Sequence, residues 1–335
     1  MSTLQFMADS IEQLDLALDQ LAIRDRNFDR FALMLIDNVV ELTLHRVAEE
    51  RQHARRLYRS RDQEDDKGLL KALGRDFDSK VAFARSLDIL SEGEADSVRN
   101  LHRFRNTAYH QGRRHERILH SLAKFYFTNA CVLYKKYRPP GWSSSSADVI
   151  PYRARKYISP AEDIGPFQYM GPESVESVWD RLLAVLDSLG DSLVSDLSAD
   201  MEYVIDDIDS AISFLASDSP TPQSRDEVVV SSQAWDLAFS PKGLAFASLK
   251  GYTDSDPFHL VSWLERSFPW PINKDPIPSW KVRLESLRRE ADAHMAFKKY
   301  CDFMNQTEAF RSVIESSAMA LDSAIQHQID VMRGK

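Results

Sequence analysis

Apolar residues recur at steps of three and four positions through much of this chain, and this spacing restricts the fold more than any other feature. It is clearest between Glu173 and Asp218, where the stripe contains Val175, Val178, Leu182, Val185, Leu189, Leu193, Leu197, Met201, Val204, Ile208, Ile212 and Leu215. The steps match the turn of an α-helix. We expect this segment to form a long helix or a helical hairpin that bends near Gly190.

The same spacing predicts helices elsewhere, so the fold class is expected to be all-α. Helical stripes cover residues 10–22, 27–59, 76–90, 92–109, 113–138 and 280–332, and Ser91 is suited to cap the helix over 92–109. Only 11 of the 335 residues are glycine and 14 are proline, which favours long helices with few connections. Two short pieces, Glu227 to Ser231 and Leu244 to Leu249, resemble paired strands instead.

Composition divides the chain into three parts. Residues 1–138 are expected to form a compact helical bundle domain. Residues 139–172 contain six of the 14 prolines and the serine run 143–146, which is typical of a linker. Residues 173–335 are expected to form a second, mainly helical C-terminal module with a regulatory or recognition function.

The net charge of −9 is unevenly distributed. Residues 101–138 hold nine basic side chains against Glu116 alone, which favours a polyanion as partner. The alternative is a solvated helix face whose counter-charges lie elsewhere in the fold. Residues 173–218 hold twelve acidic side chains against Arg181 alone. This acidic segment either folds back over the basic one and competes with the polyanion, or is only a solvated face.

Several classes of protein are excluded by what the sequence lacks. Two cysteines, Cys131 and Cys301, are too few for a disulfide framework or a cysteine-rich zinc site. The first residues carry acids and no early Lys or Arg, unlike a secretory or mitochondrial signal. The longest apolar run, 31–40, is interrupted by Asp37 and is too short to span a bilayer. We therefore expect a soluble, cytoplasmic protein that does not contact a membrane.

Common catalytic motifs are also missing. There is no Gly-rich phosphate loop, dinucleotide fingerprint, His-Glu-x-x-His, Cys-x-x-Cys or nucleophile elbow. Four histidines fall in one stretch, but no two have the i, i+4 step of a helical metal site, and the neighbouring arginines would repel a cation. We expect neither a metal nor a cofactor at these histidines, which are His102, His110, His115 and His120.

The segment Leu101 to His110 carries the most informative pattern. Arg105 is followed by Asn106, and His110 comes five positions after the arginine. On a continuous helix the two side chains would point about 140° apart, so they converge only if the helix ends between them. An imidazole can take a proton from a ribose 2′-hydroxyl, and a guanidinium can hold phosphate oxygens as charge develops. The residues suit cleavage of a phosphodiester without a metal.

The pattern Arg105-Asn106-x-x-x-His110, between two amphipathic helices of a helical bundle, resembles the signature of the HEPN superfamily (higher eukaryotes and prokaryotes nucleotide-binding). The resemblance covers about residues 10 to 138. It implies a metal-independent endoribonuclease that leaves a 2′,3′-cyclic phosphate, with two copies of the motif facing each other across a homodimer. Some relatives are toxins with a tyrosine two residues after the histidine, where this chain has Gly112.

The resemblance also assigns roles to residues. Arg105 would stabilise the phosphorane, His110 would act as base or acid, and Asn106 would orient the site. RNA is the expected partner, contacted by Arg103, Tyr109, Arg113 and Arg114. Toxin and anti-phage defence systems are the implied context, with an antitoxin or defence-system protein as a further partner.

Two alternatives stay open. The bundle is either an enzyme or a non-catalytic HEPN-like module that binds RNA, a nucleotide or a protein. At the residue level, Arg105 can instead pair with an acid such as Asp96 or Glu116. Asn106 can be a helix C-cap, and Tyr109 can belong to the core.

Overall fold

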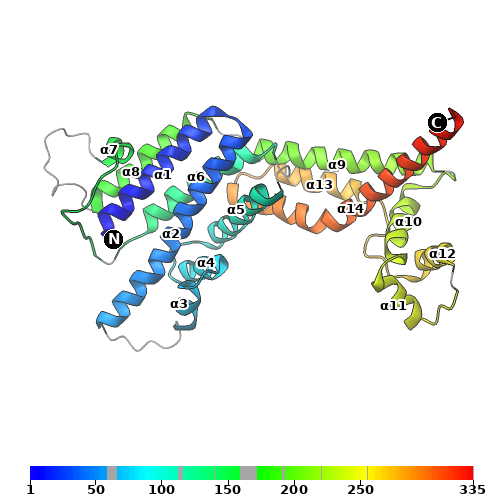
Figure 1. Cartoon of the computed structure of the whole chain (residues 1–335), viewed down its shortest axis with the longest axis horizontal. Helices are drawn as coiled ribbons and strands as arrows, with labels where there is room; N and C mark the ends of the chain where they lie inside the picture. The colour runs from blue at the N-terminus through cyan, green and yellow to red at the C-terminus, as the bar shows by residue number, and fades with distance from the viewer. Residues whose placement is uncertain are drawn as a thin grey trace. The chain divides into compact units, whose positions relative to one another are not determined.

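The computed structural model of the chain describes residues 1–58, 66–111, 116–139, 141–158, 172–190, 193–219, 221–254 and 256–334. Within these ranges the chain is helical and contains no strand, which confirms the all-α prediction (Figure 1). The helices are α1 (Thr3–Ile23), α2 (Arg26–Tyr58), α3 (Asp66–Ala72), α4 (Phe77–Ser86), α5 (Glu92–Gln111), α6 (Leu119–Lys136), α7 (Tyr152–Ile158), α8 (Pro172–Asp187), α9 (Leu193–Asp218), α10 (Arg225–Ala238), α11 (Pro241–Leu249), α12 (Pro257–Ser267), α13 (Ile277–Arg288) and α14 (Ala293–Met332).

The chain divides into two compact units. Unit 1 comprises Met1–Leu197 and Asp292–Lys298, and unit 2 comprises Ser198–Ala291 and Lys299–Lys335. Unit 1 reaches further along the sequence than the boundary expected at residue 138, because α7 and α8 pack against α1 and α8 also packs against α6.

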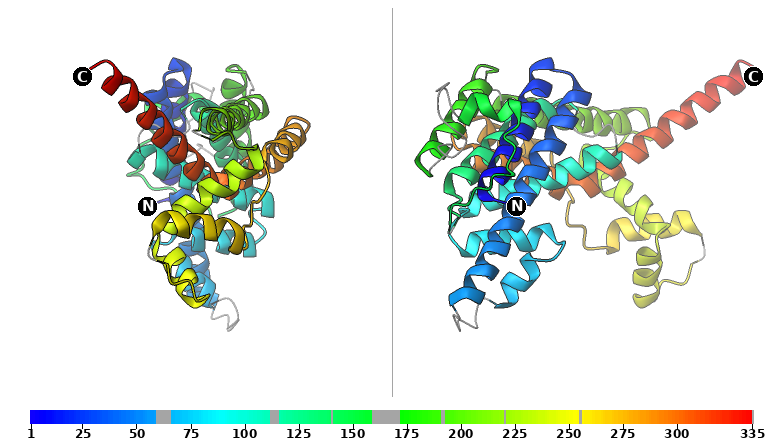
Figure 2. Two further views of the ribbon diagram at one scale, coloured as in Figure 1. Left: turned by 90° about the vertical axis from the view of Figure 1, so that its right-hand side faces the viewer. Right: turned by 60° about the vertical axis from the view of Figure 1, so that its left-hand side comes forward.

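The core of unit 1 lies among long helices that run side by side. Helix α1 packs on α2, α2 packs on α6, and α8 packs on α6, as Figures 1 and 2 show. Their facing side chains are fully buried and include Ile11, Leu14, Ile36, Leu122 and Phe127. Helices α4 and α5 pack against α2 as well, so α2 is in contact with most of the unit.

Polar caps set where α5 begins. The Glu94 amide donates to Ser91 Oγ at 3.3 Å, and the Ser91 amide donates to Glu94 Oε2 at 2.8 Å. This reciprocal pair is a capping box, and it confirms Ser91 as the expected cap. The box fixes the first turn of the helix that carries the Arg105 motif.

Part of the expected linker is packed against α1. The Thr3 amide donates to Ser143 Oγ at 2.9 Å. The buried carboxylate of Asp15 on α1 accepts from Arg153 Nη1 at 2.8 Å and from the Tyr157 hydroxyl at 2.6 Å, which attaches α7. Residues 159–171 of the expected linker lie outside the described residues.

The helical stripe over 173–218 is interrupted near Gly190, where the sequence predicts a bend. Helix α8 ends at Asp187 and α9 begins at Leu193. Gly190 has a φ of +77°, in the left-handed region that a residue without Cβ adopts without strain.

The strand prediction in unit 2 is wrong, because both pieces are helical. Residues 227–231 belong to α10, which begins with a capping box between Ser224 and Glu227. Residues 244–249 belong to α11, which begins with Pro241 after the cap Ser240. Such starts favour a helix even where β-branched residues follow.

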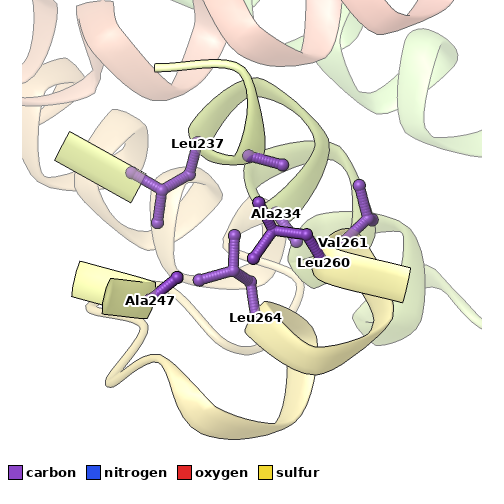
Figure 3. Packing of buried hydrophobic residues seen from close by; sticks show 7 residues of the cluster. Ala234, Leu237, Ala247, Leu260, Val261 and Leu264 are labelled. Atoms are coloured by element: carbon purple, nitrogen blue, oxygen red, sulfur yellow. The ribbon is translucent and has the colours of Figure 1, made fainter. Parts of the chain in front are cut away.

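Helices α10, α11 and α12 enclose a small apolar cluster of their own (Figure 3). Gly243 of α11 lies against the carbonyl oxygen of Leu237, where any Cβ would clash. Glycine at this position therefore permits the close approach of α11 to the end of α10. The cluster consists of Ala234, Leu237, Ala238, Ala247, Leu260, Val261 and Leu264.

Aromatic packing and ion pairs connect the remaining helices of unit 2. Trp280 of α13 lies edge-on to Phe303 and Phe310 of α14. Asp209 of α9 pairs with Arg225 of α10 at 2.6 Å and with Lys281 of α13 at 2.9 Å. Among the helices described in either unit, none combines the length and the apolar character that crossing a membrane requires.

Candidate functional site

Helix α5 carries the motif that the sequence singled out. It stays helical through Gln111, so the condition for Arg105 and His110 to converge, an end of the helix between them, is not met. Positions 105 and 110 are five residues along a continuous helix and therefore about 140° apart around its axis. The side chains of Tyr109 and His110 lie outside the described part of the chain, as do residues Arg113 and Arg114 altogether.

The side chain of Arg105 is held between a buried acid and its own neighbour. Its Nε lies 3.3 Å from Oδ2 of Asp37 on α2, in an ion pair. Its Nη1 donates to Asn106 Oδ1 at 2.8 Å. The expected alternatives Asp96 and Glu116 are therefore not its partners: Asp96 pairs with Arg99, and Glu116 pairs with arginines of α2. About a third of the Arg105 side chain stays exposed, which leaves it accessible to a ligand.

Asp37 is the centre of the site, with only 1% of its side chain exposed. Its Oδ1 accepts from the Tyr126 hydroxyl of α6 at 2.7 Å and lies 2.8 Å from His102 Nδ1 of α5. Burial, and then the adjacent Asp37 charge, raise the pKa of Tyr126 well above its usual value, so the hydroxyl remains a donor. A buried carboxylate is costly unless it is paired and hydrogen-bonded, and here three groups from two helices satisfy it.

His102 is fixed on its other side by an aromatic ring. It stacks on Phe77 of α4, with the ring centroids 3.8 Å apart and the planes 6° from parallel. The buried carboxylate, the histidine and Arg105 thus connect α2, α4, α5 and α6 through side chains of fixed orientation. Helix α5 presents Arg105 and Asn106 at the edge of this network, where 30% of the Arg105 side chain is exposed.

A second buried aspartate on α2 has a similar partner. Asp29 Oδ1 lies 2.8 Å from His120 Nδ1 of α6, and 6% of the Asp29 side chain is exposed. Asp29 and Asp37 are eight residues apart, about 12 Å along the helix. The Asp29–His120 pair is therefore a natural comparison for the Asp37–His102 pair.

Sequence reasoning missed Asp37 and assigned no role to His102. Asp37 was noted only because it interrupts an apolar run. A single acid within the buried stripe of a long helix was itself the signal, because such a charge requires a partner from another element. The partner could not be inferred, since His102 and Tyr126 lie 65 and 89 residues away.

The basic segment 101–138 is compensated to a large extent by acids of other helices. Arg103 is mostly exposed and pairs with Asp78 of α4 at 3.3 Å. Lys136 pairs with Glu94 at 2.7 Å, and Lys135 with Asp180. Lys124 is buried and so is not available to a polyanion at the surface. These contacts favour the alternative in which the counter-charges lie elsewhere in the fold.

The acidic residues of α9 also have partners within unit 2. The Tyr300 hydroxyl donates to Asp200 Oδ2 at 2.6 Å, and Arg288 pairs with Glu202 at 2.6 Å. With the two ion pairs of Asp209, these contacts indicate that part of the acidic charge stabilises unit 2 itself.

The described residues contain no group of three or more His, Cys, Asp and Glu side chains arranged to hold a metal ion. The site does contain the guanidinium of Arg105, which the buried carboxylate of Asp37 holds and the amide of Asn106 contacts. All but Asp37 lie on α5, which continues through position 110. Comparisons of the chain with protein-family models, with curated proteins and with solved structures found no match.

Proposed function

We propose that this protein is a metal-independent endoribonuclease of HEPN type that acts as a homodimer. The observation that supports the proposal best is the fixed guanidinium of Arg105, which Asp37 holds from the protein interior at 3.3 Å while part of the side chain faces solvent. A cation oriented before the substrate binds is what stabilisation of a developing phosphorane requires.

Each residue of the motif has a distinct task in the proposed reaction. The ribose 2′-oxygen attacks the adjacent phosphorus, a new P–O bond forms, and the bond to the 5′-oxygen breaks. His110 accepts the proton of the 2′-hydroxyl, and the 5′-oxygen takes a proton from a second imidazole or from water. Arg105 neutralises the charge on the non-bridging oxygens, and Asn106 keeps the guanidinium in place. The products are a 2′,3′-cyclic phosphate and a 5′-hydroxyl.

The proposed dimer follows from the course of α5. Because α5 is continuous through Gln111, positions 105 and 110 of one chain lie about 140° apart around the helix axis, which disfavours their facing one phosphate from the same direction. Two copies related by a two-fold axis can combine the arginine of one with the histidine of the other. In cells, such an enzyme would act as a toxin or an anti-phage effector controlled by a partner protein.

The direct test incubates the purified protein with mixed RNA in EDTA and identifies the ends of the products. Cyclic phosphates and 5′-hydroxyls are expected. Intact RNA under all activating conditions, at protein concentrations that permit a dimer, would contradict the proposal.

Substitution of the motif gives the first prediction. Arg105→Ala and His110→Ala should each lower the cleavage rate by about 10² to 10⁴, because each removes a group needed mainly in the transition state. Arg85→Ala is the control, since Arg85 is an exposed arginine of α4 that pairs with Glu92. Full activity in either motif variant, or an equal loss in the control, would show that cleavage does not depend on the motif.

RNA or nucleotide binding without cleavage is the second candidate function. It is favoured by the ion pair between Arg105 and Asp37, which occupies part of the guanidinium, and by the angle of about 140° between positions 105 and 110 on the continuous helix α5. A filter-binding assay beside the cleavage assay separates the two functions. Binding that requires Arg105, with no cyclic-phosphate product, would establish the non-catalytic one.

A further inference from the structure

Three exposed aromatic side chains of unit 2 gather where α10 and α12 meet, with Trp235 of α10 in contact with both Phe239, the C-cap of α10, and Phe258 of α12. Trp235 is 46% exposed, Phe239 59% and Phe258 64%. The ring centroid of Trp235 lies 5.4 Å from that of Phe239 and 5.7 Å from that of Phe258. The apolar cluster drawn in Figure 3 does not include these rings. Contiguous exposed apolar side chains, unlike isolated ones, mark surfaces that bind a partner.

Two carboxylates lie along the same pair of helices. Glu265 follows Phe258 on α12 by seven residues, which is about 10 Å along the helix and within about 20° of the same direction. Glu227 precedes Trp235 on α10 by eight residues, and its negative charge acts on Glu265. We call these five residues, Trp235, Phe239, Phe258, Glu227 and Glu265, the aromatic–acidic face.

Glu265 lacks a positive partner. No ion pair or hydrogen bond to its carboxylate occurs among the described residues, although the side chain is partly buried. Burial raises the pKa of Glu265; the charge of the adjacent Arg266 offsets this in part, and the charge of Glu227 adds a smaller rise. A partly buried carboxylate that has no hydrogen bond or ion pair gains from a cation placed directly against it. This end of the face is therefore complementary to a positive charge.

We propose that the aromatic–acidic face docks a basic amphipathic helix of a partner protein. An apolar side chain of that helix packs over Trp235 and Phe258, and a lysine or arginine two turns along the helix pairs with Glu265 and Glu227. The spacing of the face matches an apolar anchor and a cation at i and i+7. The carboxylates would repel nucleic acid and anionic lipid, which leaves a basic polypeptide as the occupant. The proposal does not depend on ribonuclease activity.

The test uses the full-length chain and two fluorescein-labelled helical peptides. Both carry leucine at one position of an alanine-rich helix, and at i+7 the first has lysine where the second has glutamate. Fluorescence polarisation should show that the lysine peptide binds at least about tenfold more tightly, since the two differ only in charge at Glu265. The difference should shrink as salt is added.

Variants of the chain locate the binding. Glu265→Gln should weaken binding of the lysine peptide about tenfold, toward that of the glutamate peptide. Trp235→Ala should weaken binding of both peptides, and its exposed position leaves the buried cluster intact. Glu285→Gln, which changes an exposed acid of α13 in the same unit, is the matched control and should have no effect.

Three results would overturn the proposal: no binding of the lysine peptide, equal binding of both peptides, or an unchanged affinity in Glu265→Gln. A different occupant has its own signature. If Trp235→Ala or Phe258→Ala converts a self-associated chain into monomers in sedimentation, the face binds a second copy of the chain and the basic-helix proposal is wrong.

Discussion

Asp37 makes the largest single contribution to the geometry of the candidate site. A carboxylate with 1% of its side chain exposed is costly unless donors surround it, and here Arg105, His102 and Tyr126 do so. The same contacts restrict the partners, since each contact with Asp37 removes rotamers from Arg105, His102 or Tyr126. The interior of unit 1 thus orients an arginine side chain that is 30% exposed.

Replacing the Asp37 carboxylate distinguishes its role in orienting Arg105 from its contribution to the stability of the fold. Asp37→Asn retains the shape but loses the charge that holds Arg105, and kcat for RNA cleavage should fall by about 10-fold to 100-fold while RNA affinity changes little. Asp29→Asn is the matched control, since Asp29 lies on the same helix and is bonded to His120 in the same way. Chemical denaturation should show that both variants lose about 1–3 kcal/mol of stability. An equal loss of kcat in both variants would show that Asp37 acts only through stability.

Asp15 predicts how unit 1 responds to acid. Burial alone would raise the pKa of Asp15, but hydrogen bonds from Lys156, Tyr157 and Arg153 outweigh it and hold the pKa below the usual 3.8. A depressed folded-state pKa contributes stability that is present above 3.8 and is lost as pH falls through the lower folded value. We expect α7 to detach from α1 below about pH 4, seen as loss of amide protection over 152–158.

The control for this prediction is Asp15→Asn, which cannot titrate. In this variant the amides of α7 should be less protected from hydrogen exchange at neutral pH. Their protection should also change less as the pH is lowered. Protection of α7 in the wild type that persists to pH 2 would contradict the assignment to Asp15.

At the level of elements, helix periodicity and caps were sufficient to predict most of the fold. The helices predicted over 27–59, 92–109 and 113–138 lie near their observed positions, and Ser91 is the cap that was expected. The helix predicted over 10–22 begins earlier, at Thr3 after the cap Ser2. The failure at 227–231 has a local cause. Three consecutive valines favour a strand by propensity, but the Ser224 capping box starts a helix whose Val228 and Val229 are buried. Tertiary burial outweighed propensity there.

The capping box gives a test at this scale. Ser224→Ala removes the side-chain acceptor for the Glu227 amide and should destabilise unit 2 by about 1 kcal/mol. Thermal unfolding followed by circular dichroism measures the change, with Ser248→Ala, an exposed serine near the end of α11, as control. A Tm equal to that of the wild type would mean that α10 is held by its packing alone.

At the scale of the whole molecule, the charge balance could not be derived from composition. The count of charged residues over 101–138 predicts a basic surface. In the structure, Arg103, Lys135 and Lys136 pair with acids from α4, α8 and α5, respectively. Those acids lie outside the segment, so its own charge balance does not include them. The same limit applies to Arg105, whose partner on α2 decides its orientation.

The proposed homodimer can be tested by mixing two inactive variants. If each site takes Arg105 from one chain and His110 from the other, a mixed dimer of Arg105→Ala and His110→Ala regains one complete site. Random exchange places one such site in half of the dimers, so activity should recover to about a quarter of the wild-type value. Co-refolded or co-expressed chains, assayed for cyclic-phosphate ends, provide the measurement.

The control mixes Arg105→Ala with a chain that carries both Arg105→Ala and His110→Ala. No intact arginine is then present, so no complete site can form. Sedimentation verifies that the mixed chains form dimers. If the mixture of the two single variants nevertheless recovers no activity, one chain supplies both groups and α5 must bend on binding RNA.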